Sequence, residues 1–129
     1  MIPNARLRLK TTTAASAGAA NTDVPFRPQA GEIWEVVWII GYNDDGIAWA
    51  YWLWTDDVVT ASEMTRKQSA ASYDYLPLGI NAMNGGPGLV APLWVTYTSF
   101  PTYRWTASAG AKTGTVKALV RVYSGQDEP

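Results

Sequence analysis

Apolar and polar residues alternate along several short segments of this chain, a pattern typical of β-strands. The strongest segment is IWEVVWII at 33–40, which is rich in β-branched and aromatic residues and lies between Gly31 and Gly41. The sequence NDDG follows at 43–46 and is typical of a tight turn between two paired strands. We therefore expect a β-hairpin, in which the strand that begins at Ile47 folds back on the first strand.

Further strands are expected at 5–13, 73–77, 93–98, 102–108 and 115–123. The polar segment TASEMTRKQSAAS has Thr60 and Glu63 at the spacing of a capping box, which predicts either a helix of two turns or a loop. The pattern thus comprises about seven or eight short strands, turns rich in glycine and proline, and at most one short helix. It predicts an all-β fold, a single-domain antiparallel β-sandwich of jelly-roll or Greek-key type.

A length of 129 residues suits one domain with one core. The segment 14–21, AASAGAAN, consists mostly of residues with small side chains and shows no periodic pattern of apolar residues, which favours a loop over a helix. We divide the chain into an N-terminal arm or edge strand at 1–13, a loop at 14–30, the β-sandwich domain at 31–125 and an acidic tail at 126–129.

Charge and composition exclude several classes of function. Ten basic residues against eleven acidic ones give no overall field that would attract nucleic acid or an anionic membrane. Histidine and cysteine are both absent, which excludes histidine-based triads, thiolate nucleophiles and sulfur metal sites. No apolar run reaches the length of a signal peptide or a membrane span, so we expect a soluble protein without a Sec signal.

The two acidic pairs, Asp44-Asp45 and Asp56-Asp57, bracket a single expected strand. At ~3.3 Å per residue they would lie roughly 30 Å apart, too far to act together on a glycosidic bond. Neither pair has the regular spacing of a calcium loop, and turn formation explains Asp44 and Asp45. We expect no catalytic residues, no cofactor and no metal site, and hence no enzyme.

The segment GIAWAYWLWTDD at 46–57 has three tryptophans and a tyrosine within six positions. Both faces of this strand are apolar, and we expect the odd positions, from Ile47 to Leu53, to form the core. The even positions would then place Trp52 and Trp54 on an outward face. Strict alternation adds three residues of the strand at 33–40 to that face: Ile33, Val37 and Ile39. Such a patch exceeds what a monomer exposes, so a loop of the same chain, a subunit or partner, or a stacked sugar ring must cover it.

Near the N-terminus, Arg6, Arg8 and Lys10 alternate with Leu7 and Leu9, the pattern of a half-buried strand. The basic side chains have two interpretations. They protect an exposed sheet edge from stray pairing, or they contact an acidic surface or phosphates of a partner. No aromatic residue is interleaved with them, which disfavours nucleic acid.

The order of these segments resembles a known family. The string PQAGEIWEVVWIIGYNDDG is followed by an aromatic strand, a polar insertion, APLWVTY and TYRWTASAGAKTGTVKALVRVY. Over roughly Pro28 to Tyr123 this is similar to the small jelly-roll capsid decoration (auxiliary or cement) proteins of tailed bacteriophages. In that family a GE-x-W-E-V-x-x-I segment opens the main sheet and a Y-x-W-x-A-x-A-G segment leads into the closing strand. The closing turn AGAKTGT departs from the family pattern, since it lacks an acid and a tight turn.

The resemblance implies a homo-oligomer, commonly a trimer, on the outer surface of the capsid, assembled in the host cytoplasm. There the protein would brace contacts between major capsid subunits, with the basic N-terminal arm reaching to a neighbour. The alternative is a carbohydrate-binding module or a receptor-binding fibre or spike domain, in which the tryptophans of the aromatic strand would face a sugar.

Overall fold

The computed structural model describes residues 6–45, 48–56, 59–63, 68–70, 76–77 and 88–124; within these, the side chains of 48–49, 56, 59–63, 68–70, 76–77 and 88–92 are left out of the description. Every regular element in these ranges is a β-strand, which confirms the predicted all-β sandwich. The strands are β1 (Arg6–Ala15), β2 (Asn21–Pro25), β3 (Glu32–Asn43), β4 (Ala48–Asp56), β5 (Val59–Glu63), β6 (Gln68–Ala70), β7 (Leu76–Pro77), β8 (Gly88–Thr96), β9 (Ser99–Thr106) and β10 (Thr113–Ser124).

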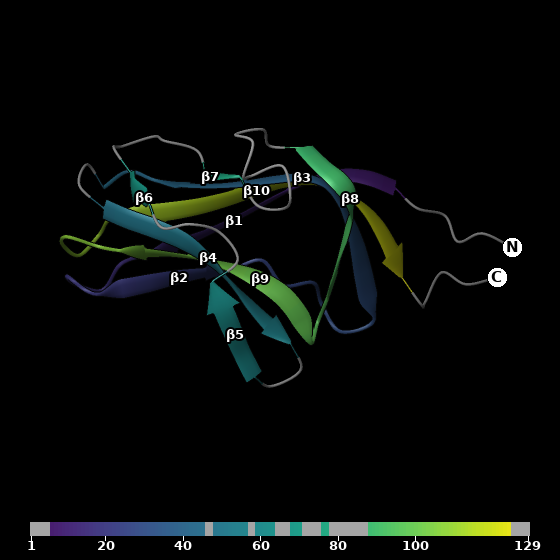
Figure 1. Ribbon diagram of the computed structural model, residues 1–129, viewed down its shortest axis with the longest axis horizontal. Coiled ribbons are helices and arrows are strands. Elements are labelled where there is room, and N and C mark those ends of the chain that lie inside the picture. Colours follow the sequence, from purple (N-terminus) through teal and green to yellow (C-terminus); the bar gives the residue numbers. More distant parts are fainter. Residues whose placement is uncertain are drawn as a thin grey trace, which may run out of the picture.

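The strands form two antiparallel sheets that pack face to face (Figure 1). The first, here named the β3 sheet, has the order β1-β10-β3 and continues from β3 to β7 and β8. The second, the β4 sheet, has the order β2-β9-β4 and continues to β5 and β6. The pairs are nested along the sequence: β1 pairs with β10, β2 with β9, β3 with β8, and β4 with β5. This nesting of antiparallel pairs across two sheets is the topology of a jelly roll.

The expected hairpin between the strands at 33–40 and 47 onward is wrong. β3 and β4 follow each other in sequence but belong to different sheets, so the chain crosses from one layer to the other after Asn43. The crossover is held by side chains. Asp45 is buried, and its carboxylate accepts hydrogen bonds from the backbone N–H and the hydroxyl of Ser108, both at 2.6 Å. Asn43, Asp44 and Asp45 therefore begin a link between the two sheets, and their hydrogen-bond partners lie far along the chain.

Two other expectations about local structure are wrong. Thr60 and Glu63, expected to begin a helix or a loop, lie in β5, and the same polar segment also contributes β6; residues 64–67 between them lie outside the described residues. The segment 14–30 is not a continuous loop, because β2 lies within it and pairs with β9. In each case strand pairing decides the local conformation over weak local signals.

The core lies between the two sheets and is centred on aromatic rings. Trp52 of β4 and Tyr103 and Trp105 of β9 are fully buried. The rings of Trp52 and Tyr103 meet edge to face with centroids 5.5 Å apart, and Tyr103 stacks on Trp105 at 6.3 Å. The β3 sheet covers them with residues of β3, β8 and β10: Trp34, Val36, Ile39, Val95, Val116, Ala118 and Val120.

Candidate interaction surface

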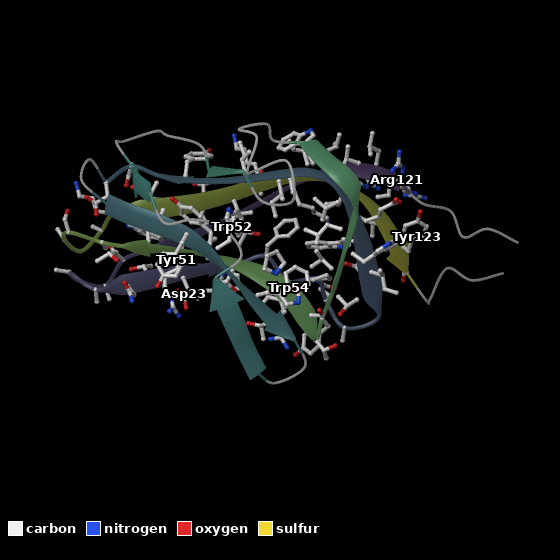
Figure 2. All side chains as sticks on the ribbon, in the orientation of Figure 1. Asp23, Tyr51, Trp52, Trp54, Arg121 and Tyr123 are labelled. Atoms are coloured by element: carbon white, nitrogen blue, oxygen red, sulfur yellow. The ribbon has the colours of Figure 1, made fainter. Side chains whose placement is uncertain are left out.

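The two faces of β4 are reversed relative to the prediction. Trp52, expected to face outward, is fully buried, and Trp54 is partly buried against the core and donates its indole N–H to Ser99 Oγ at 3.1 Å. Tyr51 and Leu53, expected in the core, lie on the opposite face of β4 and are covered there. Figure 2 shows Trp52 and Trp54 between the layers and Tyr51 beyond them.

The reversal has a physical reason. In an antiparallel sheet, directly paired residues point to the same side, and Trp52 pairs with Tyr103 while Ala50 pairs with Trp105. Ala50 leaves room for the large ring of Trp105 opposite it. The even face of β4, which has two alanines, is therefore filled by rings from the neighbouring strand β9. When both faces of a strand are apolar, alternation alone does not identify the buried one. The side chains of Ile47 and Trp49 lie outside the described part of the structure.

The predicted outward set on β3 is divided by a β-bulge. Between Val36 and Trp38 the register against β10 shifts, so that Val37 is an extra residue in that pairing; the register against β8 shifts at the same place. An extra residue reverses the alternation beyond it. Ile39, expected outside, is therefore fully buried, whereas Ile33, which precedes the bulge, is exposed. Val37 itself is half-buried.

The structure shows instead an apolar surface on the outer face of the β3 sheet. Leu7 and Leu9 of β1, expected on the buried side of a half-buried strand, point outward. They are exposed to 57% and 60%, together with Ile33 at 44% and Trp94 at 49%. These are four of the five large apolar residues that are exposed in the described part of the chain. Register places them together: Leu7 pairs with Arg121, Arg121 with Glu35, and Glu35 with Trp94.

We name this surface the outer patch and define it by its exposed and half-buried members on four strands: Leu7, Leu9, Ile33, Glu35, Trp38, Trp94, Leu119, Arg121 and Tyr123. Its centre is polar. Glu35 accepts a hydrogen bond from the hydroxyl of Tyr123 at 3.2 Å and pairs with Arg121 at 3.5 Å. The Tyr123 ring lies 5.7 Å from that of Trp94, and desolvation together with the bond to Glu35 raises the pKa of Tyr123, which keeps its hydroxyl a neutral donor. Figure 2 shows Arg121 and Tyr123 at this end of the sandwich.

The outer face of the β4 sheet has a different character. Its exposed part includes a bidentate ion pair, in which Arg104 contacts the two carboxylate oxygens of Asp23 at 2.6 Å and 3.0 Å. The hydrogen bond to Asp23 is the largest cause that raises the pKa of Arg104 above its usual value. Asp23 on β2 and Tyr51 on β4, both labelled in Figure 2, lie on either side of Arg104, and the Tyr51 side chain also bonds Arg104. The described charged residues of this face, Asp23 and Arg104, pair with each other, and the described residues expose fewer large apolar side chains here, so the outer patch is the better candidate for a contact surface.

The basic residues near the N-terminus belong to β1, which lies at the edge of the β3 sheet. Their backbone partners on β10 are Val122, Val120 and Ala118, all on the core side of the sheet. The side chains of Arg6, Arg8 and Lys10 therefore lie on the core side of the sheet, at its edge, and do not belong to the outer patch. Arg6 and Arg8 are exposed, and the Lys10 ammonium lies 5.1 Å from the centroid of the Trp34 ring.

The described residues contain no cluster of three or more residues able to hold a metal ion. Asp44 and Asp45 are occupied in the crossover, since Asp44 accepts from the backbone N–H of Thr113 at 2.7 Å and Asp45 from Ser108. The side chain of Asp56 and the whole of Asp57 lie outside the described residues. Among the described elements there is no helix with the length and apolar character to cross a membrane.

Comparisons with known proteins give no family. No protein-family model and no curated protein matches the sequence. Among solved structures, a Bacillus endospore appendage chain, from a family of disulfide-linked pili, is 14% identical with a TM-score of 0.41, and the match covers 94% of this chain and 90% of that one. A chain of the infectious bursal disease virus Gx strain is 10% identical with a TM-score of 0.35; the match covers 96% of this chain but only 35% of the viral one. Similarities at these scores carry no argument about function.

Proposed function

We propose that this chain is a non-enzymatic structural protein that assembles through the outer patch, and that it decorates the outer surface of a bacteriophage capsid. The observation that carries the proposal is the concentration of Leu7, Leu9, Ile33 and Trp94 on one face of one sheet. The jelly-roll topology, which is frequent among capsid and lectin domains, and the sequence resemblance described above support the second part.

The outer patch has the composition of an interface. Trp94 alone exposes roughly 100 Å², since an indole side chain presents about 150–250 Å² and half of it is free. With the two leucines and Ile33 the exposed apolar area reaches a few hundred Å², the size of the largest and often functional patch on a soluble protein. Aromatic residues and arginine are the usual anchors at such contacts, and here Trp94, Tyr123 and Arg121 lie side by side.

The patch also suits a second copy of the chain. It has one cation and one anion, Arg121 and Glu35, and the exposed guanidinium of one copy could bond the carboxylate of another without leaving a net charge buried. We favour a trimer on the capsid, assembled in the host cytoplasm. The edge formed by β1 would contact the major capsid protein, with Arg6, Arg8 and Lys10 as its charged groups.

Sedimentation equilibrium of the purified chain at micromolar concentration tests self-association. We expect an oligomer that dissociates when Leu9→Ser and Trp94→Ser are combined, with the fold retained because both side chains lie outside the core. Tyr97→Ser is the matched control. Tyr97 is also exposed, but Arg27 covers its ring at 3.7 Å and it does not belong to the patch. A wild-type monomer, or an oligomer that the double variant leaves intact, would contradict the proposal.

Carbohydrate binding is the second candidate, and one observation favours it. The exposed indole of Trp94 has Glu35 and Arg121 within its own row of the sheet, which gives a stacking surface with hydrogen-bonding groups beside it. Titration with a glycan panel, followed by tryptophan fluorescence, distinguishes the two functions. A monomer whose fluorescence shifts with a glycan, and no longer shifts after Trp94→Ser, would replace the assembly proposal with this one.

A further inference from the structure

The free edge of β1 is long and regular. β1 pairs with β10 over all ten of its residues, from Arg6 to Ala15, without a register shift. On its other side no described strand pairs with it, and none of its side chains is fully buried. β2, the corresponding edge of the β4 sheet, has five residues and ends at Pro25. The β2 edge is therefore short and ends in a proline, whereas the β1 edge presents a long row of backbone donors and acceptors.

Exposed edges are usually protected by prolines, bulges, shortness or charges that point inward. Of these devices β1 has only the charges. Arg6 and Arg8 are exposed on the core side of the strand, and no carboxylate in the described part of the chain pairs with either. Lys10 lies over the Trp34 ring, at the point where the row of cations meets the core. Cations on the core side of an edge strand disfavour the pairing of an apolar strand with that edge. A strand with acidic residues at the facing positions would neutralise them.

We propose that the β1 edge is a strand-addition site for an extended segment of another protein, in which acidic residues alternate with apolar ones. A strand added beside β1 continues the β3 sheet, so its alternate side chains fall on the two faces of β1. Those beside Arg6, Arg8 and Lys10 lie on the core side, where carboxylates pair with the cations. Those beside Leu7 and Leu9 lie on the outer face, where apolar side chains extend the outer patch.

A second copy of this chain does not provide such a segment. Nowhere in the 129 residues do two acidic residues stand two positions apart, so no strand of this chain presents carboxylates on successive positions of one face. The occupant is therefore a different protein. This strand-addition site deepens the proposed function, because it gives the chemistry of the segment through which a second component of the assembly would bind. It rests on the proposed function for the existence of that component.

The probe is a synthetic peptide of about seven residues, alternating glutamate and valine, titrated into isotope-labelled protein and followed by backbone amide chemical shifts. We expect saturable shifts centred on β1. Replacing Arg6→Glu and Arg8→Glu together should weaken binding at least tenfold and create binding of a matched peptide that has lysine for glutamate. Lys112→Glu, a single reversal of charge in the turn beyond the far end of β1, should leave the affinity for the glutamate peptide unchanged.

Two N-methylated peptides separate strand addition from charge attraction alone. A strand at an edge donates only the N–H groups of alternate residues to its neighbour. N-methylation of one alternate set should abolish binding, and N-methylation of the other set should preserve it. Equal binding of both peptides, or no saturable binding of the unmodified peptide, would overturn the proposal and leave the cations as protection of the edge. Self-association through the outer patch is measured without the peptide, so the two proposals fail separately.

Discussion

Tyr103 shows how one polar atom is built into the aromatic core. Its ring lies between Trp52 and Trp105, and its hydroxyl accepts a hydrogen bond from the Asn43 side-chain amide at 2.9 Å. Burial raises the pKa of Tyr103 to about 12, and the bond from Asn43 offsets part of that rise. The bond joins β9 of one sheet to the end of β3 in the other, at the point where the chain crosses between them.

The raised pKa of Tyr103 predicts a dependence of stability on alkaline pH. Below pH 10 the tyrosine is neutral in both the folded and the unfolded chain. Between pH 10 and about 12 the unfolded chain loses this proton and the folded chain keeps it, so the free energy of unfolding falls as pH rises. The loss from this group amounts to about 2 kcal/mol across the window. Urea denaturation at several alkaline pH values measures it.

Tyr103→Phe is the reference for this measurement. At neutral pH we expect the variant to be less stable by about 1–2 kcal/mol, because the buried amide of Asn43 loses its acceptor. Above pH 10 the difference should shrink, since the phenylalanine has no proton to lose. Parallel pH profiles for the two proteins would show that the hydroxyl of Tyr103 reaches solvent in the folded state.

At the scale of elements, the crossover from β3 to β4 depends on a side chain that sequence patterns assign to a turn. Asp45→Ala would leave the backbone N–H of Ser108 without its acceptor. We expect a loss of about 1–3 kcal/mol in the free energy of unfolding, measured by urea denaturation. Asp44→Ala is the matched control. Asp44 also accepts a backbone hydrogen bond, from Thr113, but in an exposed position. The loss of its carboxylate should therefore lower the free energy of unfolding by less than about 1 kcal/mol. Equal losses would show that the burial of Asp45 has no energetic role.

The sequence predicts which segments become strands better than it predicts how they pair. The segments at 33–40 and 115–123 lie within β3 and β10, and those at 93–98 and 102–108 lie in β8 and β9 except for their last two residues, because β-branched and aromatic residues at period two have few alternatives. Pairing is decided by contacts far apart along the chain. The sequence NDDG fits a hairpin turn equally well, and the residues that hold Asn43, Asp44 and Asp45 in a crossover, among them Tyr103, Ser108 and Thr113, lie more than fifty residues away.

The candidate surface was harder to predict for the same reason. Ile33 belongs to it as expected by alternation, but Ile39 does not, since the bulge at Val37 adds a residue that no sequence pattern marks. With the odd positions in the core, alternation predicts that Trp52 points outward, but the alanines of its face are a normal core arrangement, because Trp105 lies opposite Ala50. The alternation at Leu7 and Leu9 predicts that the two share a face, but that face points outward. Whether Ile33, Val37 and the basic residues of β1 contact a partner stays a prediction.

At the scale of the whole molecule, two glycines set how closely the sheets approach. Gly41 of β3 and Gly114 of β10 lie on the inner face of the β3 sheet, opposite the rings of β9. A Cβ atom at Gly41 would come within 2.3 Å of the Tyr103 ring, and one at Gly114 within 2.3 Å of the Trp105 ring. A glycine often marks the end of a strand, but Gly41 lies inside β3. The Tyr103 ring fills the space that a side chain at this position would need.

Gly41→Ala and Gly114→Ala should therefore each destabilise the fold by about 1–3 kcal/mol, since the rings they meet are held by other core side chains and the layers must move apart. Gly18→Ala is the matched control, because its Cβ meets nothing within 4 Å and its loss of backbone freedom in the unfolded chain favours folding slightly. Thermal and urea denaturation of the three variants measure the effect. If Gly114→Ala were as stable as Gly18→Ala, Trp105 would have to be free to turn aside, and the close packing of β9 against the β3 sheet would not be what holds the layers together.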